Sequence, residues 1–326
     1  MLRRIWIVIV AVCAMAAGFA GCKSARVDMT DEYVPTLAEQ MEAMNASANA
    51  NAQVVTLYYR DASGYVVPVE RMVEKQEGIA KAALMCLVSV EIDDVKLAAR
   101  GVYAPIPAGT QIDLNIKDGA ATVDLKMGEN QCATAAEEKV MLAAVVNTLL
   151  GFSTVDQVRV WIDGKETREL PNGTPVSALY KGDEFNVEPV GAPAGADGKT
   201  MLYFGNETGS CLVPVMRVLA EDTPLMAVQE MAMPRDGTGL VSVLPPDCRV
   251  LSVTINAEGV AVVDLSKEFA AVANKPAMEA MAVKGLRACL MHFPGVKDVT
   301  LTIEGNPYVP SAATMAGAEG ALNAIP

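Results

Sequence analysis

The chain of 326 residues is poor in several residue types that common functional sites require. It contains one histidine, and aromatic residues make up only 5% of it. A single histidine argues against a zinc site, which usually combines several His and Cys ligands at fixed spacing. Basic residues are also scarce, because 26 Lys and Arg stand against 39 Asp and Glu, which gives a formal net charge of −13. That charge disfavours a sequence-independent grip on nucleic acid and direct attraction to anionic lipid headgroups.

Motifs of common catalytic and cofactor sites are missing as well. The sequence has no G-x-S-x-G elbow, no Walker-type loop and no dinucleotide glycine pattern. His292 has no triad-type partner near it in the sequence, so we interpret it as structural. Asp124 and Asp264 recur at the ends of equivalent strands, and we interpret both as hydrogen-bond acceptors in the turn that leads to the next helix. The sequence therefore predicts no catalytic residue, no metal site and no cofactor.

The cysteines do not form a recognisable framework. Apart from Cys13 and Cys22 near the N-terminus, five remain, which is an odd number, and none are spaced as C-x-x-C. We expect these five to be mostly buried, small apolar side chains. They are Cys86, Cys132, Cys211, Cys248 and Cys289.

The N-terminus has the one long apolar run of the chain. Arg3 and Arg4 precede an uncharged stretch over residues 5–21, which is typical of an export signal. The sequence Phe19-Ala20-Gly21-Cys22 resembles a bacterial lipobox, and this resemblance implies that Cys22 carries lipid and anchors the chain on the outer side of the cytoplasmic membrane. An ordinary secretory signal and an uncleaved anchor are the alternatives. Each of them places the rest of the chain outside the cytoplasm.

One pattern occurs twice in the remaining chain. Residues 107–164 and 245–305 share a Pro-started segment, an apolar hairpin, a Val-Asp-Leu step, a helix and a strand that ends in Gly. The closing strands align at a constant offset of 141 residues. Each unit spans roughly 110 residues, far more than a solenoid repeat, so the pattern indicates two whole domains.

Each copy predicts the order strand, strand, helix, hairpin, helix, strand. In the first copy the strands are expected at residues 54–59 and 65–70, and Pro68 indicates an edge strand because it cannot donate a ladder hydrogen bond. A helix is expected over 76–90, and Asp118-Gly119 predicts the turn of a hairpin. Thr134 with Glu137 forms a capping pattern for the second helix. The predicted class is α+β, with two tandem homologous domains that are each a small mixed sheet packed by two helices.

Composition divides the chain further. We expect an export signal at residues 1–22, a flexible tether at 23–52, the first domain at 53–168, a Pro/Gly-rich linker at 169–198 with its hinge at 191–198, the second domain at 199–306, and a disordered tail at 307–326.

The order of motifs resembles the GerMN domain of bacterial sporulation and spore-germination lipoproteins. The likeness is carried by Leu57-Tyr58-Tyr59 and Leu202-Tyr203-Phe204, by the Val-Asp-Leu steps, and by the closing Val158-Arg159-Val160-Trp161-Ile162-Asp163-Gly164. The second copy departs at Val283-Lys284-Gly285-Leu286, in the region where the first copy has Val146-Asn147-Thr148-Leu149. The resemblance implies a ring-building type of fold and a structural role in a multiprotein complex between the mother-cell and forespore membranes. Association with peptidoglycan is a second implication.

Two Pro-bearing outer strands are the predicted surface for partners, since an edge strand leaves backbone groups that another chain can pair with. The candidate residues are Val66, Val67 and Val69 in the first copy and Leu212, Val213 and Val215 in the second.

Three classes of function compete on this basis. The first is a non-catalytic assembly component that binds envelope proteins or other copies of itself. The second is a peptidoglycan-associated or hydrolase-regulating lipoprotein. A solute-binding lipoprotein is disfavoured because its lobes would be built from longer alternating β-α units.

Overall fold

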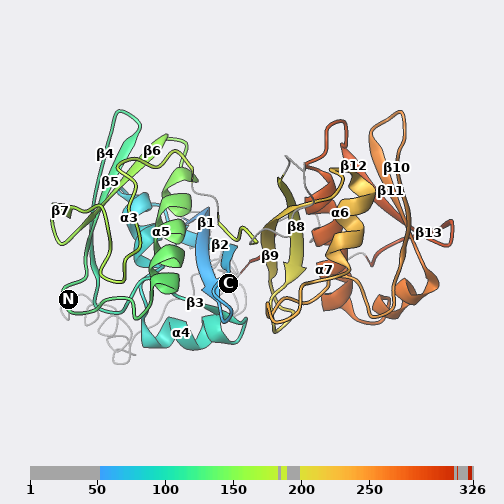
Figure 1. Ribbon diagram of the computed structural model, residues 1–326, viewed down its shortest axis with the longest axis horizontal. Coiled ribbons are helices and arrows are strands. Elements are labelled where there is room, and N and C mark those ends of the chain that lie inside the picture. The colour runs from blue at the N-terminus through green and yellow to red at the C-terminus, as the bar shows by residue number, and fades with distance from the viewer. Residues whose placement is uncertain (1–51, 183–184, 189–198, 312–313, 315–321, 325–326) are drawn as a thin grey trace, which may run out of the picture. The chain divides into compact units, whose positions relative to one another are not determined.

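The computed structural model describes residues 52–182, 185–188, 199–311, 314 and 322–324 (Figure 1). The expected export signal, the tether up to residue 51 and the expected hinge at 191–198 lie outside these residues. No helix within the described part of the chain is long and apolar enough to cross a membrane.

The first repeat contains two sheets and three helices. Its elements are, in order, β1 (Ala52–Asp61), β2 (Val66–Glu74), α3 (Ile79–Met85), α4 (Glu91–Ala98), β3 (Val102–Tyr103), β4 (Gln111–Lys117), β5 (Ala120–Lys126), α5 (Ala135–Leu150), β6 (Gln157–Ile162) and β7 (Lys165–Glu166). One sheet has the strand order β2-β1-β3 and the other β4-β5-β6-β7. Strands β5 and β6 are parallel, and α5 connects them while packing against β1 and β6.

The second repeat follows the same plan. Its elements are β8 (Lys199–Gly205), β9 (Leu212–Val218), α6 (Pro224–Met231), β10 (Val250–Ile255), β11 (Val260–Leu265), the 3-10 helix η1 (Lys267–Val272), α7 (Pro276–Leu290), β12 (Asp298–Ile303) and β13 (Asn306–Tyr308). The sheets are β8-β9 and β10-β11-β12-β13, with β11 and β12 parallel, and α7 packs against β8 and β12. The predicted α+β class with two tandem homologous domains is confirmed.

Local sequence explains most of these elements. The predicted hairpin turn lies between β4 and β5, with φ of 50° at Asp118 and 76° at Gly119, conformations that Asp and Gly tolerate best. The Oγ1 atom of Thr134 caps α5 by accepting from the Glu137 amide at 3.2 Å, as the capping pattern predicts. Strand β2 lies at the edge of its sheet, as Pro68 indicates.

The helix expected over residues 76–90 is wrong in extent. Gly78, with φ of 80°, is the N-cap of a shorter α3, and the chain is extended again at Val90. A separate helix, α4, then begins with Glu91, Asp93 and Asp94 in its first turn, where carboxylates favour the helix dipole. The second repeat has no helix at the equivalent place among its described elements.

The expectation of a disordered tail from residue 307 is also wrong for the part that the structure describes. Residues up to Tyr308 form β13, which pairs with β12. Farther along, Thr314 and Asn323 are buried. Polar side chains of these residues bind buried polar groups of the repeats: Thr314 donates to Glu279, and Asn323 bonds to the backbone of Leu212 and Pro68.

Candidate functional site: the junction between the two repeats

The two outer strands predicted to bind partners meet each other inside this chain. All six candidate side chains are buried: Val66, Val67, Val69, Leu212, Val213 and Val215. Strands β2 and β9 lie in contact, and one large hydrophobic cluster contains buried residues of both repeats, including five of the six candidates. Val66 belongs to a separate small cluster with Val140 and Ala143. The expectation of two free edges is therefore corrected, because each edge is covered by residues of the same chain.

Asn186, in the segment that follows the first repeat, satisfies one set of edge groups. Its Oδ1 atom accepts from the Val66 amide at 2.7 Å, and its Nδ2 atom donates to the Val66 carbonyl at 2.6 Å. The same Nδ2 atom donates to the Pro214 carbonyl of β9 at 2.7 Å. The backbone of the segment continues along β9, since the Met216 amide donates to the Asn186 carbonyl at 3.0 Å. One asparagine thus joins the two edges.

Asn323, in the segment that follows the second repeat, makes the equivalent bonds with the repeats exchanged. Its Oδ1 atom accepts from the Leu212 amide at 2.7 Å, and its Nδ2 atom donates to the carbonyls of Leu212 and Pro68, each at 2.8 Å. The Glu70 amide donates to the Asn323 carbonyl at 2.8 Å. Each asparagine side chain therefore hydrogen-bonds to one residue in the edge strand of one repeat and donates to a proline carbonyl in the edge strand of the other repeat.

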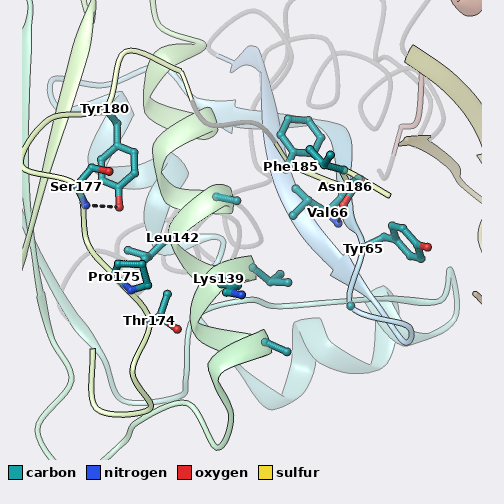
Figure 2. Close-up of a pocket in the computed structure, with 15 residues that line it drawn as sticks. Tyr65, Val66, Lys139, Leu142, Thr174, Pro175, Ser177, Tyr180, Phe185 and Asn186 are labelled. Atoms are coloured by element: carbon teal, nitrogen blue, oxygen red, sulfur yellow. Dashed lines mark hydrogen bonds between the residues drawn. The ribbon is translucent and has the colours of Figure 1, made fainter. Parts of the chain in front are cut away.

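A groove lies beside the segment that contains Asn186 (Figure 2). It has a volume of about 520 Å³ and lies between α5, β2 and the residues that follow the first repeat. Phe185 and Asn186 line one part of it, and Lys139 of α5 and Tyr180 line others. The Tyr180 hydroxyl accepts from the Ser177 amide at 3.0 Å, which fixes the loop that borders the groove.

A second groove of about 510 Å³ accompanies Asn323. Much of its lining is equivalent, since Leu212, Met281 and Lys284 stand where Val66, Val140 and Ala143 stand in the first groove. The junction is therefore built twice from the same plan: a late helix, an edge strand and an asparagine segment.

Each late helix, α5 and α7, carries a buried glutamate near its N-terminus that hydrogen-bonds to the chain just after the repeat. Glu138 accepts from the Asn172 amide at 2.8 Å and from the Asn172 side chain at 3.0 Å. The equivalent Glu279 accepts from the hydroxyls of Ser311 and Thr314, each at 2.6 Å. Burial raises the pKa of both carboxyls, but the hydrogen bonds they accept outweigh it, so the net pKa is lowered, for Glu279 to about 2.

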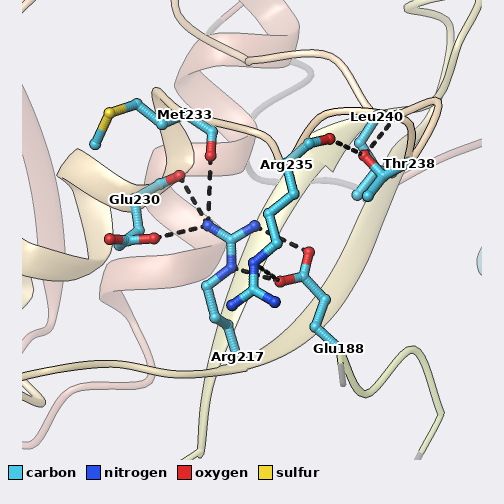
Figure 3. Close-up of polar contacts among 7 residues, drawn as sticks. All are labelled: Glu188, Arg217, Glu230, Met233, Arg235, Thr238 and Leu240. Carbon is cyan, nitrogen blue, oxygen red and sulfur yellow. Dashed lines mark hydrogen bonds and ion pairs between the residues drawn. The ribbon is translucent and has the colours of Figure 1, made fainter. Parts of the chain in front are cut away.

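A buried group of charges holds the first segment onto β9 (Figure 3). The side chain of Arg217 is 2% exposed, and it binds Glu188 through Nε at 2.7 Å and through Nη2 at 2.9 Å. Its Nη1 atom binds Glu230 at 2.8 Å, and Arg235 adds a second cation to Glu188 at 2.9 Å. Burial lowers the pKa of Arg217, but the two carboxylates outweigh it and the net pKa is raised. Glu188 lies two residues after Asn186, so this network locks the segment in place.

The aspartates weighed as catalytic candidates are turn acceptors. Asp124 accepts from the Gly164 amide at 2.9 Å, and Asp264 accepts from the Gly305 amide at 2.8 Å. Each aspartate therefore binds the turn that follows β6 or β12, and not the turn that leads to the next helix, as the sequence suggested. The reason is that β5 pairs in parallel with β6 and β11 with β12, which places each aspartate beside the glycine of that turn.

The remaining chemical candidates do not assemble a site among the described residues. His292 contacts the carbonyl of Ala288 through Nδ1 at 2.6 Å. The five cysteines of the described range are unpaired, and burial raises the pKa of Cys289 to about 12, which keeps it protonated. No group of three or more His, Cys, Asp or Glu side chains could hold a metal within the same range. Cys22 lies outside it.

Sequence reasoning missed the residues that build the junction. Glu138 and Glu279 share the constant offset of the repeats, so aligning the late helices would have paired them. Asn186 and Asn323 lie in stretches read as linker and tail, where a lone asparagine in a Pro- or Ala-rich context gives no periodic signal.

The fold is thus a tandem pair of small α+β domains. Their edge strands β2 and β9 meet, and the segment after each domain bonds to both strands. The family Germane, described as sporulation and spore germination, matches residues 56–168 and 201–309. Because these matches cover more than half of the chain, the chain belongs to this family.

One known protein is similar over most of its length, both in sequence and in the solved structure of its tandem domains. The spore germination protein GerM of Bacillus subtilis (strain 168) is 28% identical over 282 residues, which cover 83% of this chain and 76% of that protein. A solved structure of the tandem GerMN domains of the sporulation protein GerM from Bacillus subtilis matches with a TM-score of 0.58 and 27% identity, covering 78% of this chain and 92% of that one. The predicted resemblance to tandem GerMN domains is confirmed.

Proposed function

We propose that this protein is a non-catalytic component of a sporulation or germination complex on the outer side of the cytoplasmic membrane, held there by lipid on Cys22. Membership of the Germane family and similarity to GerM support the sporulation or germination role. The observation that carries the structural role is the junction, in which two copies of one domain are joined through matched asparagines. Such a pair acts as one assembly unit.

The surface proposed for envelope partners is α4, since the edges β2 and β9 are covered. Ile92 and Val95 are each 71% exposed, and their spacing of three residues places them on one helix face. Val90, just before the helix, is also exposed. Exposed apolar residues gathered on one element are typical of a protein contact surface.

Complementation of a deletion strain tests this role. Ile92→Glu with Val95→Glu should leave the thermal melt unchanged but reduce spore formation or germination at least tenfold, because charges on this face prevent apolar contact. Val309→Glu is the matched control, since Val309 is an exposed apolar residue at 82% in the other repeat. Full complementation by the α4 variant would argue against this surface.

The anchor is tested separately by detergent phase partition. Wild type should enter the detergent phase and Cys22→Ser the aqueous phase, because two acyl chains supply about 0.8 kcal/mol per buried methylene. Equal aqueous partition of both would refute the anchor.

Sedimentation with purified peptidoglycan distinguishes the alternative, a peptidoglycan-associated or hydrolase-regulating lipoprotein. The assembly role predicts that the protein stays in the supernatant. Saturable pelleting with peptidoglycan would favour the alternative.

A further inference from the structure

Asp61, the last residue of β1, has a buried carboxyl oxygen without a hydrogen-bond partner in the described part of the chain. The residue is 2% exposed, and its Oδ1 atom accepts from the amides of Ser63 at 2.9 Å and Tyr65 at 2.8 Å. The Oδ2 atom is buried as well but has no such bond. An ionised oxygen in this state is costly, because burial removes its water and no donor replaces it.

The second repeat has an asparagine, Asn206, at the position equivalent to Asp61. The two first strands align at an offset of 145 residues, which pairs these two residues and also pairs Tyr65 with Ser210. The Oδ1 atom of Asn206 accepts from the Ser210 amide at 2.9 Å, as Oδ1 of Asp61 accepts from Tyr65. The remaining side-chain atoms, Nδ2 of the asparagine and Oδ2 of the aspartate, are therefore counterparts.

The Nδ2 atom of Asn206 joins the two repeats. It donates to the Arg100 carbonyl at 2.9 Å and to the Gly101 carbonyl at 3.2 Å, both in the first repeat. An ionised aspartate has only acceptors and cannot make such a bond.

Gly239 in the second repeat is the counterpart of Gly101. The pairing of β1 with β3 joins Arg60 to Tyr103, two residues after Gly101. The equivalent bridge joins Gly205 to Val241, two residues after Gly239.

The turn after β1 packs against Gly239 as the turn after β8 packs against Gly101. A Cβ atom at Gly101 would lie 2.8 Å from side-chain atoms of Asn206 and Thr208. A Cβ atom at Gly239 would lie 2.0 Å from the Oγ atom of Ser63, the residue equivalent to Thr208. The contact between the repeats is thus built twice, with Asp61 in one copy and Asn206 in the other.

We propose that Asp61 is a neutral carboxylic acid in the folded protein, that its Oδ2–H group donates to the backbone carbonyl of Thr238 or Gly239 in the second repeat, and that this contact between the repeats is sensitive to pH. A protonated carboxyl has nearly the shape of the asparagine amide and supplies a donor at the same atom. Loss of the proton turns this donor into a buried charge that faces carbonyl oxygens. The proposal goes beyond the proposed function and does not depend on it.

The surroundings of Asp61 favour the neutral form. Burial raises the pKa of its carboxyl, and this outweighs the amide bonds of the turn and the charge of Arg60, which lower it. The Arg60 guanidinium lies over the Tyr103 ring, 5.3 Å from its centroid. The other titratable or charged side chains on the elements around Asp61 are Tyr65 before β2, Arg100 and Tyr103 beside β3, and Arg235 and Asp236 before Gly239, with Glu188 and Arg217 acting on Tyr65.

The contact is strongest in acid. The ordinary pKa of Asp61 in the unfolded chain is 3.8, and its pKa in the fold is higher. The stability that the proton contributes is therefore fully present below pH 3.8 and is lost as the pH rises through the folded pKa. Other carboxyls titrate in the same range, so a comparison of variants at each pH isolates Asp61.

Urea unfolding of wild type and Asp61→Asn across this pH range makes that comparison. The ratio of the wild-type unfolding constant to that of Asp61→Asn should be constant below pH 3.8. It should then rise with pH, about tenfold for each unit by which the folded pKa exceeds 3.8. Asn206→Asp is the reciprocal variant, and its unfolding constant should likewise rise with pH relative to wild type.

An NMR titration of the Asp61 carboxyl carbon in the full wild-type chain measures the protonation directly and needs no variant. A carboxyl that titrates at or below pH 3.8, or a wild-type to Asp61→Asn ratio that does not change with pH, would overturn the proposal. Stabilisation of wild type but not of Asp61→Asn by added calcium would also overturn it, because a cation and not a proton would then bind Oδ2.

Discussion

Single buried polar residues decide how the segments after each repeat are held. Glu138 and Glu279 are almost fully buried, yet both carry lowered pKa values because they accept several hydrogen bonds from the following chain. Asn186 and Asn323 then satisfy the edge strands. These four residues hold the chain that follows each repeat against the fold. Each of them supplies a hydrogen-bond partner that a buried polar group requires.

The lowered pKa of Glu279 predicts a pH-dependent contribution to stability. Its folded value of about 2 lies below its ordinary 4.5, so the ionised form stabilises the fold by about 3 kcal/mol, fully above pH 4.5, and this contribution is lost as the pH falls from 4.5 towards 2. Glu279→Gln should therefore be less stable than wild type at pH 7, and the difference should shrink at pH 3. Urea unfolding at both pH values measures it. A difference that does not change with pH would contradict the assignment, and the exposed Glu258→Gln serves as control.

The charge group around Arg217 predicts an asymmetric response to mutation. Arg217→Ala should cost about 3–5 kcal/mol, because it leaves the buried Glu188 short of its main partner. Glu230→Gln should cost less, since its side chain is 32% exposed and water can replace the lost contact. Chemical denaturation of both variants makes the comparison. A larger loss for Glu230→Gln would show that Glu188 is not the critical partner.

Among the elements, those with strong local signals were predictable. The Asp118-Gly119 hairpin, the Thr134 cap and the edge position of Pro68 follow from turn, capping and donor chemistry within a few residues. The role of the edges was not predictable, because whether a strand edge meets solvent or another part of the chain depends on contacts far away in sequence. Val66 and Asn186 are 120 residues apart, and Pro68 and Asn323 are 255 apart.

The cap of α5 gives a prediction on the element scale. Thr134→Ala should lower stability by about 1 kcal/mol, because the Glu137 amide loses its acceptor. The N-cap of α7, Lys275, makes no side-chain cap bond, so Lys275→Ala should have little effect. Thermal melts of the two variants provide the comparison. Equal losses would mean that the cap bond contributes nothing measurable.

On the scale of the whole molecule, the two repeats share one continuous hydrophobic cluster instead of folding around separate cores. The two repeats also pack closely at Gly101. A Cβ atom there would lie 2.8 Å from side-chain atoms of Asn206 and Thr208 in the other repeat. Contacts of this closeness couple the repeats energetically. We therefore expect the duplicated repeats to unfold as one cooperative unit.

Calorimetry tests this cooperativity. Wild type should unfold in one transition, with equal calorimetric and van't Hoff enthalpies, because neither repeat can unfold without exposing the β2 and β9 edges of the other. The double variant Asn186→Ala with Asn323→Ala removes the side-chain bonds that cross the junction and costs about 1–3 kcal/mol per site, so its unfolding should split into two transitions. Thr134→Ala, which removes a cap bond within one repeat and no bond between the repeats, should lower the melting temperature while keeping a single transition. Two transitions in wild type, or one in the double variant, would show that the asparagines do not couple the repeats.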